Sequence, residues 1–488
     1  MDLLNLEQME EIEEVIVIEQ VYKGVNYLVD PSTNEIVSEE GEIEGLFINK
    51  IPLLTPDIKN LDIKQMKVLD KFKLGENIFV SGPAGTGKSH LIKILKMYSI
   101  LLSKKMQVTA MTGCASQLLK MDSKTIHSWA GIGIYNNTFE SIYISMCKRG
   151  RKKIWGEIDI LVCDEVSMMS KKLFELLDYI GKRVRRNNKP FGGIQLIFSG
   201  DFYQLPPICG ENSDPEDGKF CFESLLWKDT FPETTNLTKI YRQDDRKFTN
   251  ILNQIRIGEP SRAAINTLRK RMIPCKLKDI KPTILLPRRN VVDRINQREH
   301  SKLPIEKSKK YKPTILEESD KLTTPLEKIL EKKDISEKQY QKELKYHKKL
   351  WASLDSIEIR VGDQVMCTHN INETLVNGTR GVVIDIQENP IVKLVDGTVT
   401  EIVPYVWTHE RIPGLSFKLM PLMYAWALTI HKCQGTTLDL CIIDVGSGIF
   451  EYGQTYVALS RVKSLNGLYI TSLNPSKIKV NPKVKAFY

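Results

Sequence analysis

Residues 82–89 read Gly-Pro-Ala-Gly-Thr-Gly-Lys-Ser, which is a complete phosphate-binding loop. A strand-like run at 77–80 precedes the loop, and a helix-compatible run at 91–102 follows it. In that context the loop N–H groups and the helix N-terminus bind phosphate oxygens. The Lys of such a loop reaches the β- and γ-phosphates, and the Ser hydroxyl binds Mg²⁺. The sequence therefore predicts a site for ATP and Mg²⁺ built from Gly82, Pro83, Ala84, Gly85, Thr86, Gly87, Lys88 and Ser89.

An acidic pair, Asp164-Glu165, ends a second apolar run at 158–163. We expect Asp164 to hold Mg²⁺ through water and Glu165 to polarise the attacking water. An acidic pair at a strand end can also be a solvated turn, but the phosphate loop upstream favours the catalytic interpretation. Gln204 follows a third strand-like run, and a Gln in that place can contact the γ-phosphate or its water.

Two arginines are candidates for the positive charge that the γ-phosphate needs in the transition state. Arg242 stands in Ile-Tyr-Arg-Gln, and Arg461 ends Tyr-Val-Ala-Leu-Ser-Arg. ATPases with phosphate loops often take this charge from a second domain, so that domain closure and hydrolysis become coupled. A single Arg is more often a surface charge, so these two assignments depend on the rest of the chain.

The composition describes a soluble protein of several domains. At 488 residues the chain predicts two to four domains, and 42% hydrophobic with 27% charged residues is typical of globular proteins. No apolar run reaches the length of a membrane span. The nine cysteines are scattered without a Cys-x-x-Cys pair, which favours reduced thiols in an intracellular compartment over a zinc or iron–sulfur site.

The charge is distributed unevenly along the chain. Residues 1–60 carry a net charge of −11, which leaves +21 on the remainder of a chain whose total is +10. A basic body of this size indicates a polyanionic partner, although diffuse Lys and Arg also serve solubility. Charge alone leaves these two interpretations equally open.

The elements that must position these residues follow from the hydrophobic pattern. Between 61 and 231, apolar runs alternate with helical patterns, which predicts an α/β fold with a mostly parallel sheet. A polar, basic stretch at 132–157 interrupts it. The Lys/Glu-rich segment 304–350 is expected to be partly helical, and 357–415 has the short strands and Gly turns of a small β-barrel. Residues 1–58 are either a β-hairpin near Tyr22–Asp30 or a flexible acidic tail.

These motifs, in this order, resemble the Pif (petite integration frequency) helicases, the RecD-like superfamily 1B group that moves 5′ to 3′ on single-stranded DNA. The match runs from about 61 to 473. The similar segments are Gln65 with 75–77, 110–116, 125–133, 164–168, 174–195, 200–207, 237–243, 424–439 and 453–461. Cys114 and Cys433 depart mildly from the family pattern. Residues 22–45 are similar to short pieces of proteins from large DNA viruses, which raises a viral origin as a hypothesis.

The resemblance implies two RecA-like domains with inserts. The implied units are an acidic appendage at 1–58, domain 1A at 59–235 with a 1B wedge at 132–157, domain 2A at 236–356 and 421–488 with the insert 304–350, and an SH3-like barrel, domain 2B, at 357–420. Gln65 would read adenine, and Gly435 would contact the nucleotide. The residues expected to touch single-stranded DNA are Thr112, His127, Trp129, Phe202, Tyr203, His431 and Lys432. For Trp129, ordinary core packing is an equally good interpretation.

The implied activity is that of an ATP-dependent DNA helicase in replication, recombination or repair. We expect forked or structured DNA as substrate, a monomeric enzyme, a basic protein partner for the acidic segment, and a location in the nucleus or at a cytoplasmic viral replication site. A DNA-stimulated ATPase that remodels complexes without strand separation is the main alternative. A nucleotide kinase or switch protein fits poorly, because it lacks the second, arginine-bearing lobe.

Overall fold

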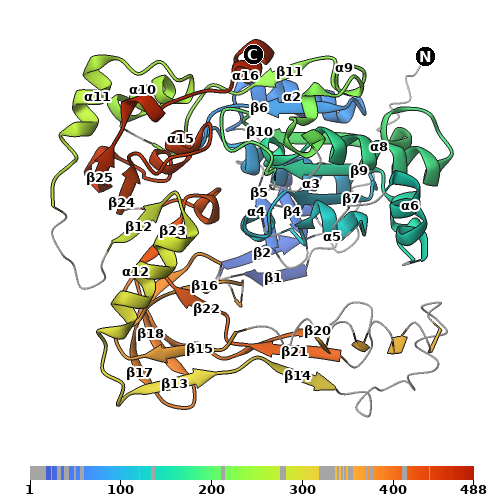
Figure 1. Ribbon diagram of the computed structural model, residues 1–488. Coiled ribbons are helices and arrows are strands. Elements are labelled where there is room, and N and C mark those ends of the chain that lie inside the picture. Colours follow the sequence, from blue (N-terminus) through green and yellow to red (C-terminus); the bar gives the residue numbers. More distant parts are fainter. Residues whose placement is uncertain are drawn as a thin grey trace, which may run out of the picture.

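The computed structural model shows two α/β lobes with a β-rich region below them (Figure 1). It describes the strands between 18 and 54 and residues 60–488, with gaps at 120, 133–137, 149, 210–214, 244, 275–281, 318–335, 338–339, 342–343, 346–347, 350–354, 370, 373–374, 376, 409–414 and 439. Within these described residues, no helix has both the length and the apolar character needed to cross a bilayer.

Lobe 1 is built on a six-stranded sheet in the order β11-β6-β10-β9-β7-β8, with every neighbouring pair parallel. Its strands are β6 (Ile78–Ser81), β7 (Met106–Ala110), β8 (Lys124–Thr125), β9 (Ile160–Asp164), β10 (Gln195–Gly200) and β11 (Thr234–Asn236). Successive side chains of β6 enter different cores: Phe79 joins one hydrophobic cluster, while Ile78 and Val80 join another. Both faces of the sheet are therefore buried, as a parallel sheet requires.

Helices cover both faces of this sheet. They are α2 (Ile63–Lys73), α3 (Lys88–Leu101), α4 (Gly113–Leu119), α5 (Ile126–Ala130), α8 (Lys171–Arg185) and α9 (Leu226–Thr230), with 3₁₀ turns η1 (Val166–Met168), η2 (Pro190–Gly193), η3 (Pro215–Gly218) and η4 (Cys221–Glu223). The stretch 132–157 adds two helices, α6 (Phe139–Lys148) and α7 (Lys152–Glu157), while 133–137 and 149 lie outside the described residues. Arg183 on α8 pairs with Glu140 on α6 at 2.8 Å, and Trp155 on α7 is buried. The added helices are thus packed onto lobe 1.

Lobe 2 contains a four-stranded parallel sheet in the order β23-β12-β24-β25. Its strands are β12 (Thr283–Leu286), β23 (Ala427–Thr429), β24 (Cys441–Val445) and β25 (Leu468–Leu473). Its helices and turns are α10 (Arg246–Arg256), α11 (Arg262–Arg269), α12 (Arg289–Ser301), η6 (His431–Cys433), α15 (Gln454–Leu459), η7 (Leu465–Gly467) and η8 (Pro475–Lys477). Since β23 lies far from β12 in sequence, the β-rich region is an insertion into this lobe.

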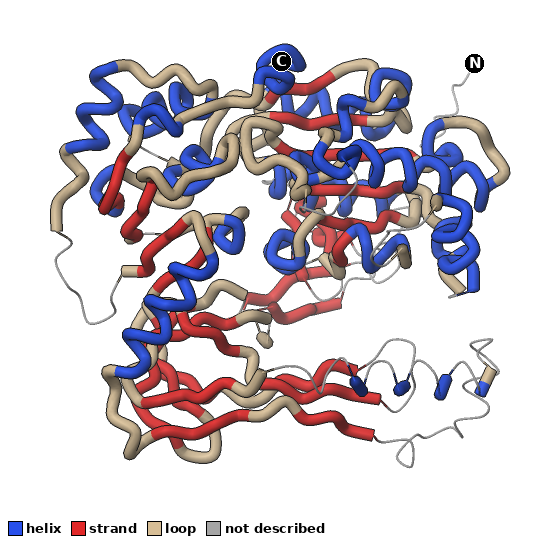
Figure 2. The backbone as a smooth tube through the Cα atoms, in the orientation of Figure 1, coloured by secondary structure: helices blue, strands red, loops and turns tan. Residues whose placement is uncertain are grey.

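The β-rich region consists of antiparallel strands, which Figure 2 shows almost free of helix. Its three sheets are β13-β15, β14-β21-β20 and β19-β18-β17-β16-β22. The strands are β13 (Ser308–Tyr311), β14 (Thr314–Glu317), β15 (Ile357–Arg360), β16 (Gln364–Cys367), β17 (Arg380–Ile386), β18 (Pro390–Leu394), β19 (Val399–Glu401), β20 (Tyr405–Thr408), β21 (Leu415–Leu419) and β22 (Leu422–Tyr424). Closure of these strands into an SH3-like barrel stays a prediction.

The start of the Lys/Glu-rich segment, which was expected to be helical in part, forms strands. Residues 308–317 form β13 and β14, which pair with the edges of β15 and β21. The buried Tyr311 side chain joins the hydrophobic cluster of the β-rich region with Ile359, so tertiary pairing decides the conformation here. Residues 318–335 of the segment lie outside the described residues.

The acidic N-terminal part forms a five-stranded antiparallel sheet in sequence order. Its strands are β1 (Ile18–Tyr22), β2 (Val25–Val29), β3 (Glu35–Val37), β4 (Ile43–Ile48) and β5 (Ile51–Leu54). The stretch Tyr22–Asp30, expected to be one strand of a hairpin, instead contributes to both β1 and β2, and β2 pairs with β1 and β3. Residues 1–17 lie outside the described residues.

The last helix, α16 (Pro482–Phe487), returns from lobe 2 to lobe 1 (Figure 1). Phe487 stacks on Phe222 with ring centroids 4.5 Å apart, and Tyr488 stacks on Tyr203 at 5.0 Å. Lys483 also pairs with Glu223 of lobe 1 at 2.5 Å. The chain end therefore links the two lobes on the side opposite the β-rich region.

Candidate active site

The phosphate-binding loop lies between β6 and α3, as its sequence context requires. Gly85 and Gly87 have φ values of +85° and +81°, which favour glycine. A Cβ on Gly85 would lie 2.6 Å from Cβ of Arg242, and one on Gly87 would lie 2.8 Å from Nε2 of Gln65. No side chain among the described residues caps the start of α3, so its first N–H groups remain available to an anion.

Lys88 is half-buried and reaches back to its own loop. Its Nζ donates to the carbonyl oxygens of Gly82 at 2.6 Å and Pro83 at 3.0 Å. Burial lowers the pKa of Lys88, while the charges of Asp201, Glu165 and Asp164 oppose that effect. A phosphate would offer this ammonium a full negative charge in place of two carbonyls, which are weaker partners.

The acidic pair stands at the carboxyl end of β9. Asp164 accepts a hydrogen bond from the N–H of Glu165 at 2.9 Å, and Glu165 has a φ of +56°, an uncommon conformation for a non-glycine residue. Burial raises the pKa of both carboxyls, and the charge of Asp164 raises that of Glu165 further. The pair is thus held at a strand end in a conformation that costs energy.

Mg²⁺ fits the oxygen atoms found here. The Ser89 hydroxyl is near enough to Asp164 to lower the pKa of that carboxyl, although burial raises it more. Among the described residues no three His, Cys, Asp or Glu side chains gather at one point. Mg²⁺ prefers oxygen ligands, and here a hydroxyl and a carboxylate would be joined by oxygens of phosphate and water.

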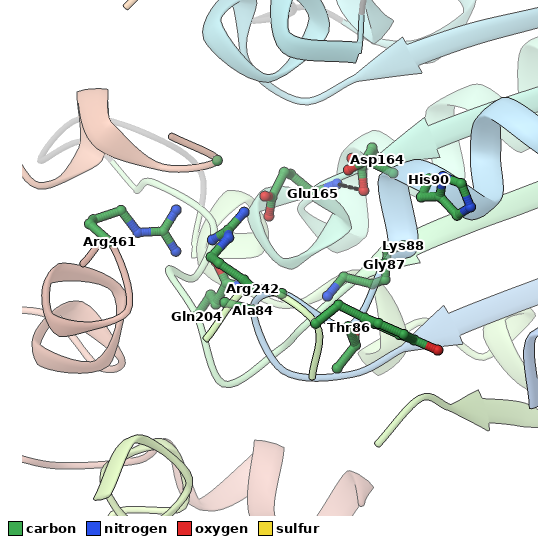
Figure 3. Close-up of a pocket in the computed structure, with 14 residues that line it drawn as sticks. Ala84, Thr86, Gly87, Lys88, His90, Asp164, Glu165, Gln204, Arg242 and Arg461 are labelled. Carbon is green, nitrogen blue, oxygen red and sulfur yellow. Dashed lines mark hydrogen bonds between the residues drawn. The ribbon is translucent and has the colours of Figure 1, made fainter. Parts of the chain in front are cut away.

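Arg461 reaches the same space from lobe 2 (Figure 3). It lies just beyond the C-cap residue Ser460 of α15 and is almost fully buried. Its Nε donates to Val457 O at 2.8 Å, and its Nη1 donates to Cys433 O at 3.4 Å and Thr436 O at 3.2 Å. Burial, helped by the neighbouring Arg242, lowers the pKa of Arg461 to about 10.

Arg242 comes from the segment between β11 and α10, beside the loop. The N–H of the preceding Tyr241 donates to Gly85 O at 2.8 Å, and burial lowers the pKa of Arg242. Figure 3 shows both arginine side chains extending toward Glu165. Burial disfavours the charged form of both arginines, and both therefore face a position where the negative charge of a γ-phosphate would stabilise them.

These groups surround one cavity of about 300 Å³. The lining residues come from both lobes: Ala84, Gly85, Thr86, Gly87, Lys88, Ser89, His90, Asp164, Glu165, Gln204, Tyr241, Arg242, Gly435 and Arg461. All six predicted catalytic residues line it. Gln204 is buried, and its Oε1 has no hydrogen-bond partner among the described residues, which leaves an acceptor available to a water molecule.

Gln65 stands behind the loop rather than on the cavity wall. Its Oε1 accepts from the N–H of Asp62 at 3.1 Å, and its Nε2 donates to Thr86 O at 3.4 Å. The adenine-reading role stays a prediction. Tyr241, which the sequence reasoning missed, is exposed on the cavity wall, and an aromatic residue directly before Arg242 was the available signal.

The lobes touch through polar contacts that the sequence did not predict. The N–H of Ala84 donates to the Tyr456 hydroxyl at 2.9 Å, and Nε2 of Gln434 donates to Oε2 of Glu165 at 3.0 Å. Arg256 on α10 makes two bonds of 2.9 Å to the carboxylate of Asp201. Both Gln434 and Tyr456 belong to segments that resembled family motifs, which was the only local signal.

Comparison with known proteins identifies the family. Residues 60–264 match the model of the PIF1-like helicases, and 355–386 match the 2B domain of the DNA helicase Pif1. The ATP-dependent DNA helicase PIF1 of Xenopus laevis is 34% identical over 96% of this chain and 70% of its own length. The zebrafish (Danio rerio) PIF1 is 33% identical over 91% of this chain and 66% of its own. This chain belongs to the PIF1-like helicase family.

Solved structures agree with this assignment. The Pif1 helicase of Candida albicans has a TM-score of 0.72 and 33% identity, covering 88% of this chain and 98% of that one. Bacteroides Pif1 bound to single-stranded DNA has a TM-score of 0.62 and 27% identity, covering 88% and 96%. A forked double-stranded DNA complex with two coordinating Pif1 helicases has a TM-score of 0.63, with 27% identity and the same coverage. The chain spans about two thirds of the length of the curated relatives named above.

Four predicted DNA contacts of this PIF1-like helicase lie near the carboxyl ends of strands. Thr112 follows β7, where its hydroxyl oxygen accepts from the N–H of Ala115 at 3.1 Å. His127 follows β8, and burial lowers its pKa. His431 and Lys432 form η6 after β23, with Lys432 exposed and the pKa of His431 lowered by burial. Their contact with DNA stays a prediction.

Three predicted DNA contacts are wrong, because the side chains are buried. Trp129 is 2% exposed and packs on Trp155, with ring centroids 4.6 Å apart. Phe202, also 2% exposed, belongs to an aromatic core and lies 4.7 Å from Phe222. Tyr203 is 9% exposed, stacks on the ring of Tyr488 and lies 4.4 Å from the guanidinium of Arg256. None of these three rings offers a face to a base.

An exposed ring that the sequence reasoning missed lies on lobe 2 of the helicase. Phe450 is 55% exposed in the loop after β24 and stacks on His431 with ring centroids 6.1 Å apart. The guanidinium of Arg288 lies 5.8 Å from the same ring. An exposed aromatic ring beside an arginine suits stacking on bases. The signal in the sequence was an aromatic residue within a Gly-containing loop between two family motifs.

Proposed function

We propose that this chain hydrolyses ATP between its two lobes to move 5′ to 3′ along single-stranded DNA and to separate duplex or structured DNA. As a PIF1-like helicase the chain is an ATP-dependent DNA helicase. The observation that carries the proposal is the shared cavity, because Lys88 and Glu165 come from lobe 1 and Arg461 from lobe 2. Any change in the distance between the lobes then changes the environment of the γ-phosphate.

Each side chain has a role in the proposed reaction. Lys88 binds the phosphates, and Ser89 with Asp164 holds Mg²⁺, which neutralises charge on the phosphate oxygens. Glu165 accepts the proton of the attacking water, with Gln204 orienting that water. Arg242 and Arg461 stabilise the charge that spreads over the γ-phosphate oxygens in the transition state.

Single-stranded DNA would cross both lobes at the carboxyl ends of the strands. Thr112 and His127 would contact it from lobe 1, and His431, Lys432 and Phe450 from lobe 2. The single-stranded DNA bound by Bacteroides Pif1 supports this ligand. Phosphate contacts make affinity fall steeply with salt, and stacking of about 1–3 kcal/mol per base tolerates any sequence, as a translocating motor requires.

The role in replication, recombination or repair belongs to the same proposal. We also propose that the chain acts inside the cell as a monomer, and that residues 1–58 dock a basic protein. The −11 charge of residues 1–60 and the small antiparallel sheet between 18 and 54 support a folded docking module. The viral origin stays a hypothesis.

Forked duplexes of opposite tail polarity test the proposal against a remodelling ATPase. We expect ATP-dependent strand separation of a fork with a free 5′ tail, little separation of the matching fork with only a 3′ tail, and hydrolysis stimulated by a single-stranded oligonucleotide. Hydrolysis stimulated by DNA without separation of either fork would instead favour the remodelling ATPase. Separation of the 3′-tailed fork alone would overturn the polarity.

A further inference from the structure

The catalytic glutamate is hydrogen-bonded to a side chain of lobe 2. Nε2 of Gln434 donates to Oε2 of Glu165 at 3.0 Å. Gln434 is buried, and its own Oε1 has no hydrogen-bond partner among the described residues. A buried amide with one unpaired polar atom costs free energy. The buried position of Gln434 beside Glu165 therefore lowers the stability of the fold.

This hydrogen bond opposes the role expected of Glu165 as a general base. A general base must direct a carboxylate oxygen at the attacking water, and a hydrogen bond donated to that carboxylate makes it a weaker base. The backbone of Glu165 is in the left-handed region, at a φ of +56°, so the residue already occupies an energetically costly conformation. With Oε2 directed at Gln434, that oxygen is turned toward lobe 2.

Gln434 lies within a turn that leads to the DNA side of lobe 2. It directly follows η6, whose His431 and Lys432 reach the surface, and its N–H donates to His431 O at 3.3 Å. The guanidinium of Arg461 donates hydrogen bonds to the carbonyl oxygens of Cys433 and Thr436 in the same turn. A shift of η6 would therefore move Gln434, and with it the anchors of Arg461.

We propose that Gln434 is a positioning residue that restrains Glu165 until single-stranded DNA engages η6. Binding of DNA to His431 and Lys432 shifts the turn. The shift breaks the hydrogen bond from Gln434, so that Oε2 of Glu165 can turn toward the water. It also allows Arg461 to approach the γ-phosphate. This inference rests on the proposed function and adds the way DNA would control the ATP site. The restraint keeps hydrolysis slow when no DNA is bound.

Substitution of Gln434 tests the restraint. Gln434→Met keeps the length of the side chain without the amide, and Gln434→Asn keeps the amide but shortens its reach. Steady-state hydrolysis would be measured without DNA and with a saturating oligo-dT, together with KM for ATP and the melting midpoint. We expect the DNA-free rate of both variants to rise about 10-fold or more, the effect of losing one hydrogen bond to a charged group. The DNA-stimulated rate and KM should stay near wild type.

Gln364→Met is the matched control, because Gln364 is an equally buried glutamine that donates to Ala425 O at 3.2 Å, away from the cavity. Its DNA-free rate should not change. A DNA-free rate in the Gln434 variants that is unchanged, or that falls together with the stimulated rate, would overturn the inference while leaving the proposed function intact. A wild-type enzyme that ignores the oligonucleotide would overturn the proposed function itself.

Discussion

At the scale of single residues, the site keeps charges of both signs in surroundings that disfavour them. Burial lowers the pKa of Lys88 and of Arg461 and raises the pKa of Asp164 and of Glu165. Bound nucleotide would supply the phosphate charge that the cations lack, and Mg²⁺ would neutralise the carboxylate of Asp164. The site is therefore prepared for its ligand at the cost of the protein's stability.

Replacing Lys88 tests the phosphate site. Lys88→Ala should lower ATP hydrolysis by at least about 100-fold, because the phosphates lose a preorganised cation. The fold and much of the binding to single-stranded DNA should remain, since among the described residues the Nζ of Lys88 bonds to carbonyls of its own loop. Hydrolysis, fluorescence anisotropy with an oligonucleotide and the melting midpoint measure these three properties. Lys93→Ala, at an exposed position of α3, is the control, and wild-type turnover in Lys88→Ala would refute the assignment.

Replacing Arg461 tests the contribution of lobe 2. Arg461→Ala should reduce the DNA-stimulated kcat by about 1,000-fold, the effect expected for an arginine that stabilises phosphoryl transfer, with DNA binding affected far less. Because the guanidinium also holds the turn at Cys433 and Thr436, Arg461→Lys serves as a second variant that keeps the charge without the fork geometry. Arg289→Ala, on the surface of lobe 2, controls for lost charge. An unchanged kcat in Arg461→Ala would show that the assignment is wrong.

At the scale of elements, α10 is fixed to the end of β10 by a buried ion pair. Asp201 is fully buried, and Arg256 makes two hydrogen bonds to it while covering the ring of Tyr203. Burial by itself would lower the pKa of Arg256, but Asp201 raises it above its usual value. This pair joins a strand of lobe 1 to a helix of lobe 2.

Breaking that pair on one side should destabilise the protein more than removing both charges. Arg256→Ala leaves the carboxylate of Asp201 buried and uncompensated, at a cost of about 3–5 kcal/mol. The double variant Asp201→Asn with Arg256→Ala should recover part of the loss, because no buried charge remains. Thermal melting of the two variants and the wild type measures the effect. Equal melting midpoints for the single and double variants would contradict this role of the pair.

At the scale of the whole molecule, a charge of −11 on residues 1–60 is attached to a body of +21. Such a segment can compete with DNA for the basic surface, or it can dock a basic protein. Surface charges affect association rates and salt dependence more than they affect the fold. The antiparallel sheet between 18 and 54 favours docking over a purely electrostatic tail.

Deletion of residues 1–58 distinguishes the two roles. We expect the truncated enzyme to bind a fluorescent oligonucleotide and to unwind a fork as well as the intact chain, because docking needs a partner that is absent from the assay. Titrations at two salt concentrations measure this. Tighter binding by the truncated enzyme at low salt, with a difference that shrinks as salt screens the charges, would show instead that the segment competes with DNA.

The sequence by itself determined the nucleotide site and the α/β class of both lobes. A phosphate loop is local, so its residues and flanking elements can be read from a short window, and strands buried on both faces leave continuous apolar runs. Burial of single aromatic residues was decided only by tertiary structure. Trp129, Phe202 and Tyr203 are buried by Trp155, Phe222 and Tyr488, which lie 26, 20 and 285 positions away along the chain. The contact of Gln434 with Glu165 likewise exists only because two lobes meet, and no local pattern records which side chains face each other across that boundary.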